Sequence, residues 1–195
     1  MIIKSKKDTS ANFVYDNNNL EEVSSYKHLG INIHHKLNWK YSIERRINGW
    51  WKAYFGLENN CKQEYMVMWD KRKFIFETLV TLVILYCCEV WGCNISRESW
   101  RKIEKIQKRF IMYNLKIKSN TSYPILLIEV GLPPIEYITM YRYSMYKNKI
   151  NNMEYQRLPK IALNSSQGHL RLKRAWYKDT MAWLNHWGIH EHTAL

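Results

Sequence analysis

Residues 96–115 read SRESWRKIEKIQKRFIMYNL and carry the clearest helical pattern in the chain. Apolar side chains recur there at intervals of three and four residues, which places them on one face of an α-helix. Ser96 can accept a hydrogen bond at the start of such a helix, and Glu98 complements the positive end of its dipole. The stripe expected to enter a core consists of Trp100, Ile103, Ile106 or Gln107, and Phe110. The pattern therefore predicts an amphipathic helix over residues 97–115.

The opposite face of this predicted helix is basic. It carries Arg101, Lys102, Lys105, Lys108 and Arg109. Such a face can follow a phosphate backbone, although a row of cations is also the ordinary solvated side of a helix. A second basic segment near the C-terminus carries Arg171, Lys173, Arg174 and Lys178. Two basic helices on an otherwise apolar framework favour a polyanionic partner.

Two segments before this helix also show helical patterns. Residues 40–62 show a helical repeat, although Gly49 and Gly56 weaken the prediction of an unbroken helix. The apolar side chains expected on its core-facing side are Ile43, Ile47, Trp50, Trp51, Tyr54 and Phe55. Residues 67–91 are apolar on nearly every side after a charged start, which predicts a central, buried helix. Their longest apolar run is about half of the roughly 20 residues that a membrane span needs. We therefore expect a buried helix there and no membrane span.

Glycine and proline divide the chain after residue 118. Ser122 or Thr121 is expected to cap a short helix over residues 124–130, which Gly131 ends. Pro133–Pro134 then opens a helix that continues to about residue 151. Tyrosine and methionine side chains form a stripe on residues 137–146, and such a stripe is more often core than partner surface.

The residues after this helix form the last part of the predicted fold. Residues 152–168 contain proline, serine and glycine and predict a loose connector. A final helix is predicted over residues 169–186.

The N-terminal residues follow a β-like pattern instead. Residues 13–15 are a short apolar run, residues 16–19 supply turn-forming side chains, and residues 20–23 begin a return strand. Residues 26–33 read as a further strand with alternating apolar positions. The pattern predicts a small N-terminal β-hairpin or a three-stranded edge sheet.

The predicted fold is therefore mainly α, with a bundle of about five to six helices after the β segment. Three parts are expected along the chain. They are a β segment over residues 1–38, a helical domain over residues 39–151, and a connector with a C-terminal basic helix over residues 152–195.

The charge of the chain points in the same direction as its basic helices. Thirty Lys and Arg residues against 17 Asp and Glu residues leave a net charge of +13. Such an excess favours phosphate contact through counterion release, and the 9 Trp and 14 Tyr residues offer rings for base stacking. A nucleic-acid partner is favoured over a merely lysine-rich surface, and a membrane surface is the weakest of the three readings.

The sequence contains no recognisable catalytic centre. Its aspartates, Asp8, Asp16, Asp70 and Asp179, are far apart, whereas two-metal chemistry needs clustered carboxylates. There is no phosphate-binding glycine loop or nucleophile elbow, and the C-terminal histidines match no closed zinc pattern. We expect no enzyme activity, no metal, no cofactor and no small-molecule substrate.

The cysteines and the N-terminus indicate the cellular compartment. Cys61, Cys87, Cys88 and Cys93 form no CxxC pair. They are expected to be reduced, packed thiols. The first ten residues lack the apolar region of a signal peptide. A nuclear or cytoplasmic protein that is not secreted is expected.

Four stretches, taken in order, resemble one known family. They are Ser24–Ile31 with Lys36–Trp39, Leu82–Gly92, Ile103–Phe110 and Pro124–Pro134. Each is similar to a segment that follows the catalytic core in the reverse transcriptases of LINE-type (non-LTR) retrotransposons. Each pattern alone is loose, but four in the same order across roughly residues 1–150 are specific.

The resemblance implies a primer grip, a helical thumb and the region beyond the thumb. The primer-grip-like positions are Tyr26, His28, Leu29 and Gly30. In that family the primer grip positions the primer end, and the thumb helices follow the primer–template duplex by shape and charge. The implied activity is sequence-independent binding of RNA, DNA or their hybrid.

The family's aromatic-x-Asp-Asp catalytic box would precede residue 1, so the resemblance implies a truncated remnant without polymerase activity. His28 stands where an aromatic residue is usual, and Cys87 stands where glycine is usual. Within a packed helix, the change at Cys87 indicates relaxed constraint or local repacking. Two alternatives stay open: the product of a non-functional retroelement-derived reading frame, and a helical protein-interaction module.

Overall fold

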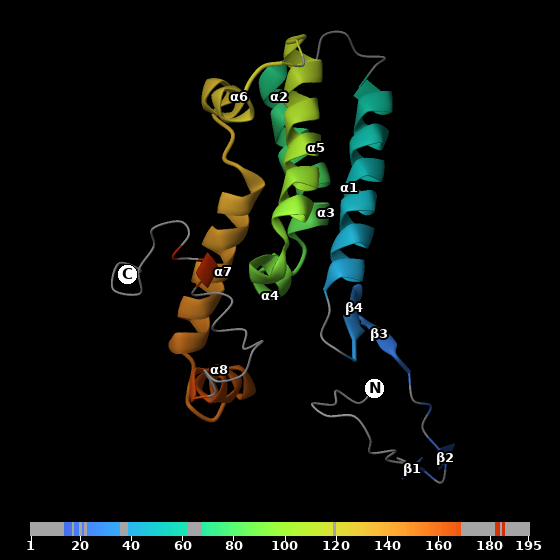
Figure 1. Cartoon of the computed structure of the whole chain (residues 1–195), viewed down its shortest axis with the longest axis vertical. Helices are drawn as coiled ribbons and strands as arrows, with labels where there is room; N and C mark the ends of the chain where they lie inside the picture. The colour runs from blue at the N-terminus through green and yellow to red at the C-terminus, as the bar shows by residue number, and fades with distance from the viewer. Residues whose placement is uncertain are drawn as a thin grey trace.

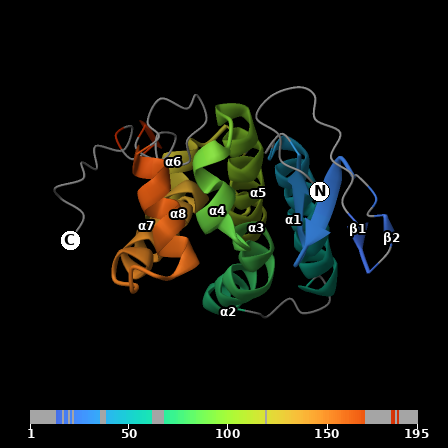
Figure 2. The same ribbon diagram turned by 90° about the horizontal axis from the view of Figure 1, so that it is seen from below.

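Three long helices, α1 (Lys40–Cys61), α5 (Arg97–Leu115) and α7 (Ile135–Asn151), lie side by side and form the body of the structure (Figure 1). The middle helix, α5, contacts both of the others, and the view from below shows the same order (Figure 2). The structure is a computed structural model. It describes residues 14–16, 18–19, 21, 23–35, 39–61, 68–118, 120–168, 182–183 and 185.

The other elements of the described residues are short. The helices are α2 (Trp69–Ile75), η1 (Phe76–Thr81, a π-helix), α3 (Leu82–Leu85), α4 (Cys88–Trp91), η2 (Gly92–Asn94, a 3-10 helix), α6 (Tyr123–Val130) and α8 (Leu158–Gly168). Two antiparallel sheets precede them, β1 (Val14–Tyr15) with β2 (Asn18–Asn19) and β3 (Ser25–His28) with β4 (Ile31–His34). The predicted class, mainly α after a small β segment, is confirmed. Across the described ranges, no helix has both the length and the apolar character to cross a membrane.

The helix predicted over residues 97–115 is confirmed as α5. Ser96 precedes it in an extended conformation, and its Oγ accepts a 3.2 Å hydrogen bond from the backbone N–H of Ser99. The predicted stripe is buried along its whole length and includes both Ile106 and Gln107. Packing of this face stabilises the helix more than intrinsic propensity does.

Gln107 is the polar member of that buried stripe, and both ends of its amide are used. Its Oε1 accepts a 2.6 Å hydrogen bond from the Tyr123 hydroxyl, and its Nε2 donates a 2.9 Å bond to the carbonyl oxygen of Pro133. Burial raises the pKa of Tyr123, which keeps the hydroxyl protonated as a donor. The network fastens α5 to the start of α6 and to the segment between α6 and α7, and it satisfies an amide that would be costly to bury alone.

The first long helix, α1, is continuous through both glycines that weakened its prediction. Its core face is buried at Ile43, Ile47, Trp50 and Tyr54. Apolar burial at four positions outweighs the roughly 1 kcal/mol that a helix-interior glycine costs. The buried face is narrower than predicted, because Phe55 is 42% exposed and Trp51 is only half-buried.

The centre of the core is aromatic. Phe76 of η1 stacks on Phe110 of α5, with ring centroids 3.9 Å apart, and its ring centroid lies 6.3 Å from that of Trp50 in α1. All three side chains are buried. Three elements that are distant in sequence therefore meet at one stack, where each buried ring contributes about 1.5–3 kcal/mol of hydrophobic stabilisation.

The prediction of one continuous, buried helix over residues 67–91 is wrong. The described part of this segment forms α2, η1, α3 and α4 in succession. The break falls at Cys87, whose φ of +54° lies in the left-handed region and cannot continue a right-handed helix. Burial is also incomplete, because Phe74 and Leu79 are each 66% exposed. Apolar side chains point to all sides of these short helices, but neighbouring elements cover only some of those sides.

The single strand predicted over residues 26–33 is also wrong. The chain reverses at Leu29 and Gly30, whose φ values of +44° and +82° are those of a two-residue hairpin turn. The hairpin pairs Tyr26 with Ile33 and His28 with Ile31. Alternating apolar residues are compatible with one strand or two, and the turn conformation decides between them.

The first predicted hairpin forms with a tighter turn than expected. Its return strand begins at Asn18 rather than at residue 20, and Val14 pairs with Asn19. Asp16 adopts a φ of +50°, and its carbonyl oxygen accepts a 3.1 Å hydrogen bond from the Asn18 side chain. The side-chain amide therefore closes the turn and allows an earlier return.

The helices predicted on either side of Gly131 are confirmed. Gly131 follows α6 with a φ of +62°, and Pro134 precedes α7. Ser122 occupies the position before α6 but makes no side-chain capping bond. Each of these helix ends lies where proline or glycine chemistry predicts it.

The loose connector predicted over residues 152–168 is wrong from residue 158 onward, where α8 begins. Lys160 donates a 2.8 Å hydrogen bond through Nζ to the carbonyl oxygen of Asn151 at the end of α7. This bond and the packing of α8 on α7 explain why a segment rich in serine is helical. The final helix predicted over residues 169–186 lies outside the described residues, apart from residues 182, 183 and 185, which are helical.

The tyrosine and methionine stripe of α7 divides between core and solvent. Met140 and Tyr143 are buried. Tyr137, Tyr141 and Met145, spaced four residues apart, are exposed instead. The expectation that the stripe belongs to the core is therefore wrong for these three residues. The opposite side of α7 packs against α4 and η2, which accounts for the difference.

Candidate nucleic-acid interface

The five cations predicted on the outer side of α5 lie on one side of the helix, opposite its buried stripe. We call this set, Arg101, Lys102, Lys105, Lys108 and Arg109, the α5 basic face. Lys108 is half-buried and the other four residues are exposed. A helical repeat of 3.6 residues brings positions 101, 105, 108 and 109 into one row, so their charges act on the same side of the molecule.

Glu98 is an exposed carboxylate beside this face, and it is already engaged. Glu98 accepts a 3.0 Å ion-pair contact from Lys102 one helical turn away. The hydrogen bond from Lys102 lowers the pKa of Glu98, and the charge of Lys40 in α1 lowers it further. The start of α1 therefore adds a cation close to the α5 basic face.

At the other end of the face, Arg109 lies over three aromatic rings of α1. Its guanidinium carbon is 5.2 Å from the ring centroid of Phe55 and 5.9 Å from those of Trp51 and Tyr54. Burial raises the pKa of Tyr54 to about 12, so this hydroxyl is protonated at neutral pH. Such cation–π contacts hold the guanidinium in place while leaving its edge able to bind an anion.

Sequence reasoning missed this aromatic cluster. Trp51 and Phe55, one turn apart in α1, stack on each other with ring centroids 5.5 Å apart, and Phe55 is exposed. Their spacing was visible in the sequence, but we assigned both to the core face of α1. Proteins that bind single-stranded nucleic acids combine exposed rings, on which bases stack, with cations that contact the phosphates.

Other cations of the described chain serve the fold. Lys73 donates through Nζ to the carbonyl oxygens of Val130 and Gly131 at 3.3 and 3.1 Å, which satisfies the end of α6. Arg72 donates a 2.9 Å hydrogen bond to the side chain of Asn114 in α5. A high net charge alone does not distinguish such internal cations from those of the α5 basic face.

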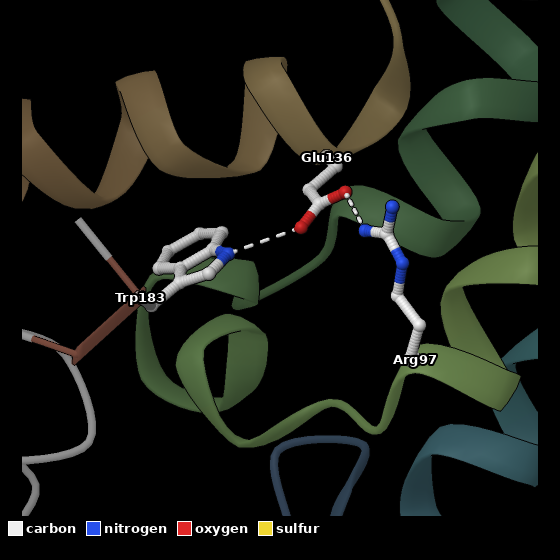
Figure 3. A network of polar contacts seen from close by, with 3 residues as sticks. All are labelled: Arg97, Glu136 and Trp183. Atoms are coloured by element: carbon white, nitrogen blue, oxygen red, sulfur yellow. Dashed lines mark hydrogen bonds and ion pairs between the residues drawn. The ribbon is translucent and has the colours of Figure 1, made fainter. Parts of the chain in front are cut away.

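The second predicted basic group, Arg171, Lys173, Arg174 and Lys178, lies outside the described residues. Trp183, which follows it, is described and packs on the helical body. Its ring stacks on Trp100 with centroids 6.4 Å apart, and its Nε1 donates a 3.2 Å hydrogen bond to Glu136 (Figure 3). Glu136 is buried and also accepts a 3.3 Å bond from Arg97, so one carboxylate joins α5, α7 and the Trp183 segment.

The primer-grip-like residues lie in the β3–β4 hairpin. Tyr26 and His28 belong to β3, with ring centroids 6.3 Å apart, while Leu29 and Gly30 form the turn. Tyr26 and Leu29 are exposed. The hairpin is held to the helices at its turn by the Tyr86 hydroxyl, which donates a 2.7 Å bond to the carbonyl oxygen of Leu29.

The remaining chemistry-bearing groups are few. Cys88 is buried, and burial raises the pKa of its thiol to about 12. Among the described residues, no three His, Cys, Asp or Glu side chains gather as a metal site would require. The chain matches no protein-family model, no curated protein and no solved structure.

Proposed function

We propose that the chain binds nucleic acid without sequence preference through the α5 basic face, and that it has no polymerase activity of its own. The observation that carries the proposal is the α5 basic face itself, whose five cations outnumber the two carboxylates of the same helix, Glu98, which Lys102 already pairs, and the half-buried Glu104. Contacts of this kind recognise the phosphate backbone and leave the bases unread.

The aromatic cluster beside Arg109 strengthens the proposal. Phe55 exposes a ring at the edge of the cationic face, where a base from a single strand or from the end of a duplex can stack. Cations alone are typical of a solvated helix, whereas cations with an adjoining exposed ring are typical of nucleic-acid surfaces.

We further propose that the chain derives from the primer-grip and thumb region of a LINE-type reverse transcriptase. The backbone at Cys87 supports this origin. The family pattern has glycine at this position, and the φ of Cys87 is +54°, in the region that glycine enters without strain. The change from glycine to cysteine therefore lies in a turn. The sequence alone had placed it within a packed helix.

Binding is tested with an RNA–DNA hybrid and single strands of several sequences, by fluorescence anisotropy over a range of salt concentrations. We expect affinities that are similar among sequences and that fall steeply with salt, by about 0.9 in log Kd per log salt for each phosphate contact. No binding at low salt, near 50 mM, would contradict the proposal.

Matched variants assign the binding to the α5 basic face. The test variant carries Arg101→Gln, Lys105→Gln and Lys108→Gln, which leaves the Glu98–Lys102 pair intact. The control carries Lys71→Gln, Lys149→Gln and Arg157→Gln, three exposed cations elsewhere, and has the same net charge. The test variant should make the salt slope shallower by up to about three, whereas the control should change it little. Equal losses in the two variants would show that net charge alone drives binding.

A second candidate function rests on the exposed side of α7. Tyr137, Tyr141 and Met145 form an apolar strip there, and exposed apolar strips of this kind mark protein contacts. We propose as the alternative a helical interaction module, in which case the purified chain should self-associate through this strip. Light scattering after size-exclusion chromatography should then show Tyr141→Lys shifting the chain towards monomer. A chain that is monomeric at all concentrations would argue against this alternative.

A further inference from the structure

A cavity of about 170 Å³ lies between the β3–β4 hairpin and the helices α1 and α3. Its lining residues are Gly30, Asn32, Ser42, Arg45, Arg46, Gly49 and Val83. The volume is more than ten times the roughly 10–15 Å³ that one water molecule requires, so it can hold a small polyatomic group. The cavity shares no residue with the α5 basic face.

The walls of this cavity carry two cations and no carboxylate. Within the described residues, neither Arg45 nor Arg46 forms an ion pair. Arg45 is exposed, and Arg46 is half-buried. Two arginines that line one cavity without a carboxylate would each gain from a negative charge bound in it.

Arg46 is held in place and has donor capacity to spare. Its guanidinium carbon lies 5.0 Å from the ring centroid of Tyr86 and 6.0 Å from that of Trp91. Its Nη2 is buried without a hydrogen-bond partner among the described residues. Burial lowers the pKa of Arg46 from its ordinary value, because the charged guanidinium is partly removed from water. A buried donor without an acceptor is unfavourable, and a bound anion would accept its hydrogen bond and compensate for the buried positive charge.

The other walls are fixed and leave the space open. The Ser42 hydroxyl donates a 2.5 Å hydrogen bond to the carbonyl oxygen of Asn32, which ties α1 to β4 beside the arginines. Gly49 has no side chain, and a Cβ there would lie 3.6 Å from Val83. A hydrogen bond between α1 and β4 therefore frames the cavity beside its cations.

From this combination we propose that the cavity is a binding site for a phosphate-type oxyanion, held by Arg45 and Arg46. Guanidinium groups match the geometry of phosphate oxygens and bind them with two parallel hydrogen bonds. The phosphate can come from a free anion in solution or from the backbone of a nucleic acid. The inference does not depend on the proposed role of the α5 basic face, because different residues carry it.

The test uses the whole chain with two probes. Inorganic phosphate is titrated by isothermal calorimetry and by thermal unfolding, against sodium chloride at equal ionic strength. An RNA–DNA hybrid is titrated separately by fluorescence anisotropy. Arg45→Gln removes one cation at an exposed position, whereas Gly49→Leu fills space without changing the charge. Arg157→Gln, at an exposed arginine outside the cavity and the α5 basic face, is the matched control for loss of one positive charge.

If a free anion occupies the site, inorganic phosphate should bind saturably and raise Tm beyond the chloride control. Arg45→Gln and Gly49→Leu should each weaken that binding about tenfold or more, while Arg157→Gln leaves it unchanged. If the source is a nucleic-acid backbone, the same two variants should instead weaken hybrid binding by a similar factor. Either pattern supports the site.

The proposal is overturned if neither probe distinguishes the two cavity variants from the wild type. It is also overturned if phosphate raises Tm equally in the wild type and in both variants. Circular dichroism establishes whether Gly49→Leu folds, and Arg45→Gln decides the question if it does not. If the phosphate site behaves as expected but the α5 variants bind the hybrid as tightly as the wild type does, only the proposed function is overturned.

Discussion

The Tyr86 hydroxyl donates a 2.7 Å hydrogen bond to the backbone carbonyl oxygen of Leu29. This contact joins the loop between α3 and α4 to the turn of the β3–β4 hairpin. Leu29 has a φ of +44°, a conformation that residues other than glycine, asparagine and aspartate seldom adopt. The bond therefore helps to hold a strained turn in place, and through it the position of the hairpin on the helices.

Removing that hydroxyl should loosen the hairpin and leave the helical core unchanged. Tyr86→Phe keeps the ring beneath Arg46 but loses the hydrogen bond, at an expected cost of about 0.5–1.5 kcal/mol. Amide hydrogen exchange should accelerate over residues 25–34 and stay constant in α5. Tyr155→Phe, at an exposed tyrosine outside this contact, is the control. Unchanged exchange in the hairpin would show that the bond does not hold the turn.

Cys87→Gly should stabilise the protein. A side chain in the left-handed region costs about 1–2 kcal/mol, and glycine avoids that cost while losing roughly 0.5–1 kcal/mol through greater freedom in the unfolded chain. The expected net gain in the free energy of unfolding is a few tenths to about 1 kcal/mol, measured by urea denaturation. Cys88→Gly, at a buried helical position, should be destabilising instead. A loss of stability in Cys87→Gly would contradict the strain at this turn.

Gly92, which directly follows α4, packs closely against Thr139 of α7. A Cβ at position 92 would collide with Cγ2 of Thr139, and Trp183 lies next to it. Gly92→Ala should therefore lower the free energy of unfolding by about 1–3 kcal/mol through overpacking. Adding Thr139→Ser removes the obstructing methyl group but retains the hydroxyl that bonds to Ile135. The double variant should recover most of the loss, and no recovery would mean that the collision is not the cause.

Two substitutions at Glu136 separate its charge from its role as a hydrogen-bond acceptor. Glu136→Gln keeps an oxygen for Trp183, and Arg97 is 61% exposed, so the lost ion pair should cost at most about 1 kcal/mol. Glu136→Ala leaves the Trp183 N–H without an acceptor and should cost about 1–3 kcal/mol. Urea denaturation compares the two. Equal losses would show that the charge matters more than the contact with Trp183.

Glu104 should make stability fall as pH rises. Burial raises its pKa above the ordinary value of 4.5, so the fold favours the protonated carboxyl and opposes its ionisation. Stability is then lost as pH rises from the unfolded-state value through the raised folded-state value. Glu104→Gln should be relatively more stabilising at pH 7 than at pH 4, as measured by thermal unfolding at both.

Glu98 provides a control of opposite sign for that experiment. Its pKa is lowered by Lys102, so its contribution is present above the unfolded-state value and is lost as pH falls. Glu98→Gln should therefore be relatively more destabilising at pH 7 than at low pH. The same trend in both variants would contradict the assigned pKa shifts.

Much of the fold was predictable wherever the pattern was local. The limits of α5 follow from Ser96 and from a stripe with a helical repeat, and Gly131 and Pro134 mark helix ends because their backbones restrict or permit particular conformations. The failures have a common cause. Residues 67–91 and residues 158–168 carry patterns compatible with several structures, and the neighbouring elements select among them.

The candidate site divides in the same way. Periodicity alone places Arg101 and Lys105 on one side of α5, because a helix determines the relative direction of its own side chains. Sequence reasoning could not show that Arg109 lies over Phe55, because that contact depends on how α1 and α5 are placed against each other. The cavity beside Arg46 was invisible for the same reason, since its walls come from a hairpin and two helices.

The basic, amphipathic helix over residues 97–115 is thus what the sequence determined by itself, since a 3.6-residue repeat sorts apolar from charged side chains without reference to any neighbour. Only the tertiary structure decided which of those cations meet aromatic rings and where the apolar run before Cys87 breaks. It also decided that two arginines of α1 face the β3–β4 hairpin across a cavity. These outcomes depend on contacts between distant segments, whose energies appear only when the helices pack together.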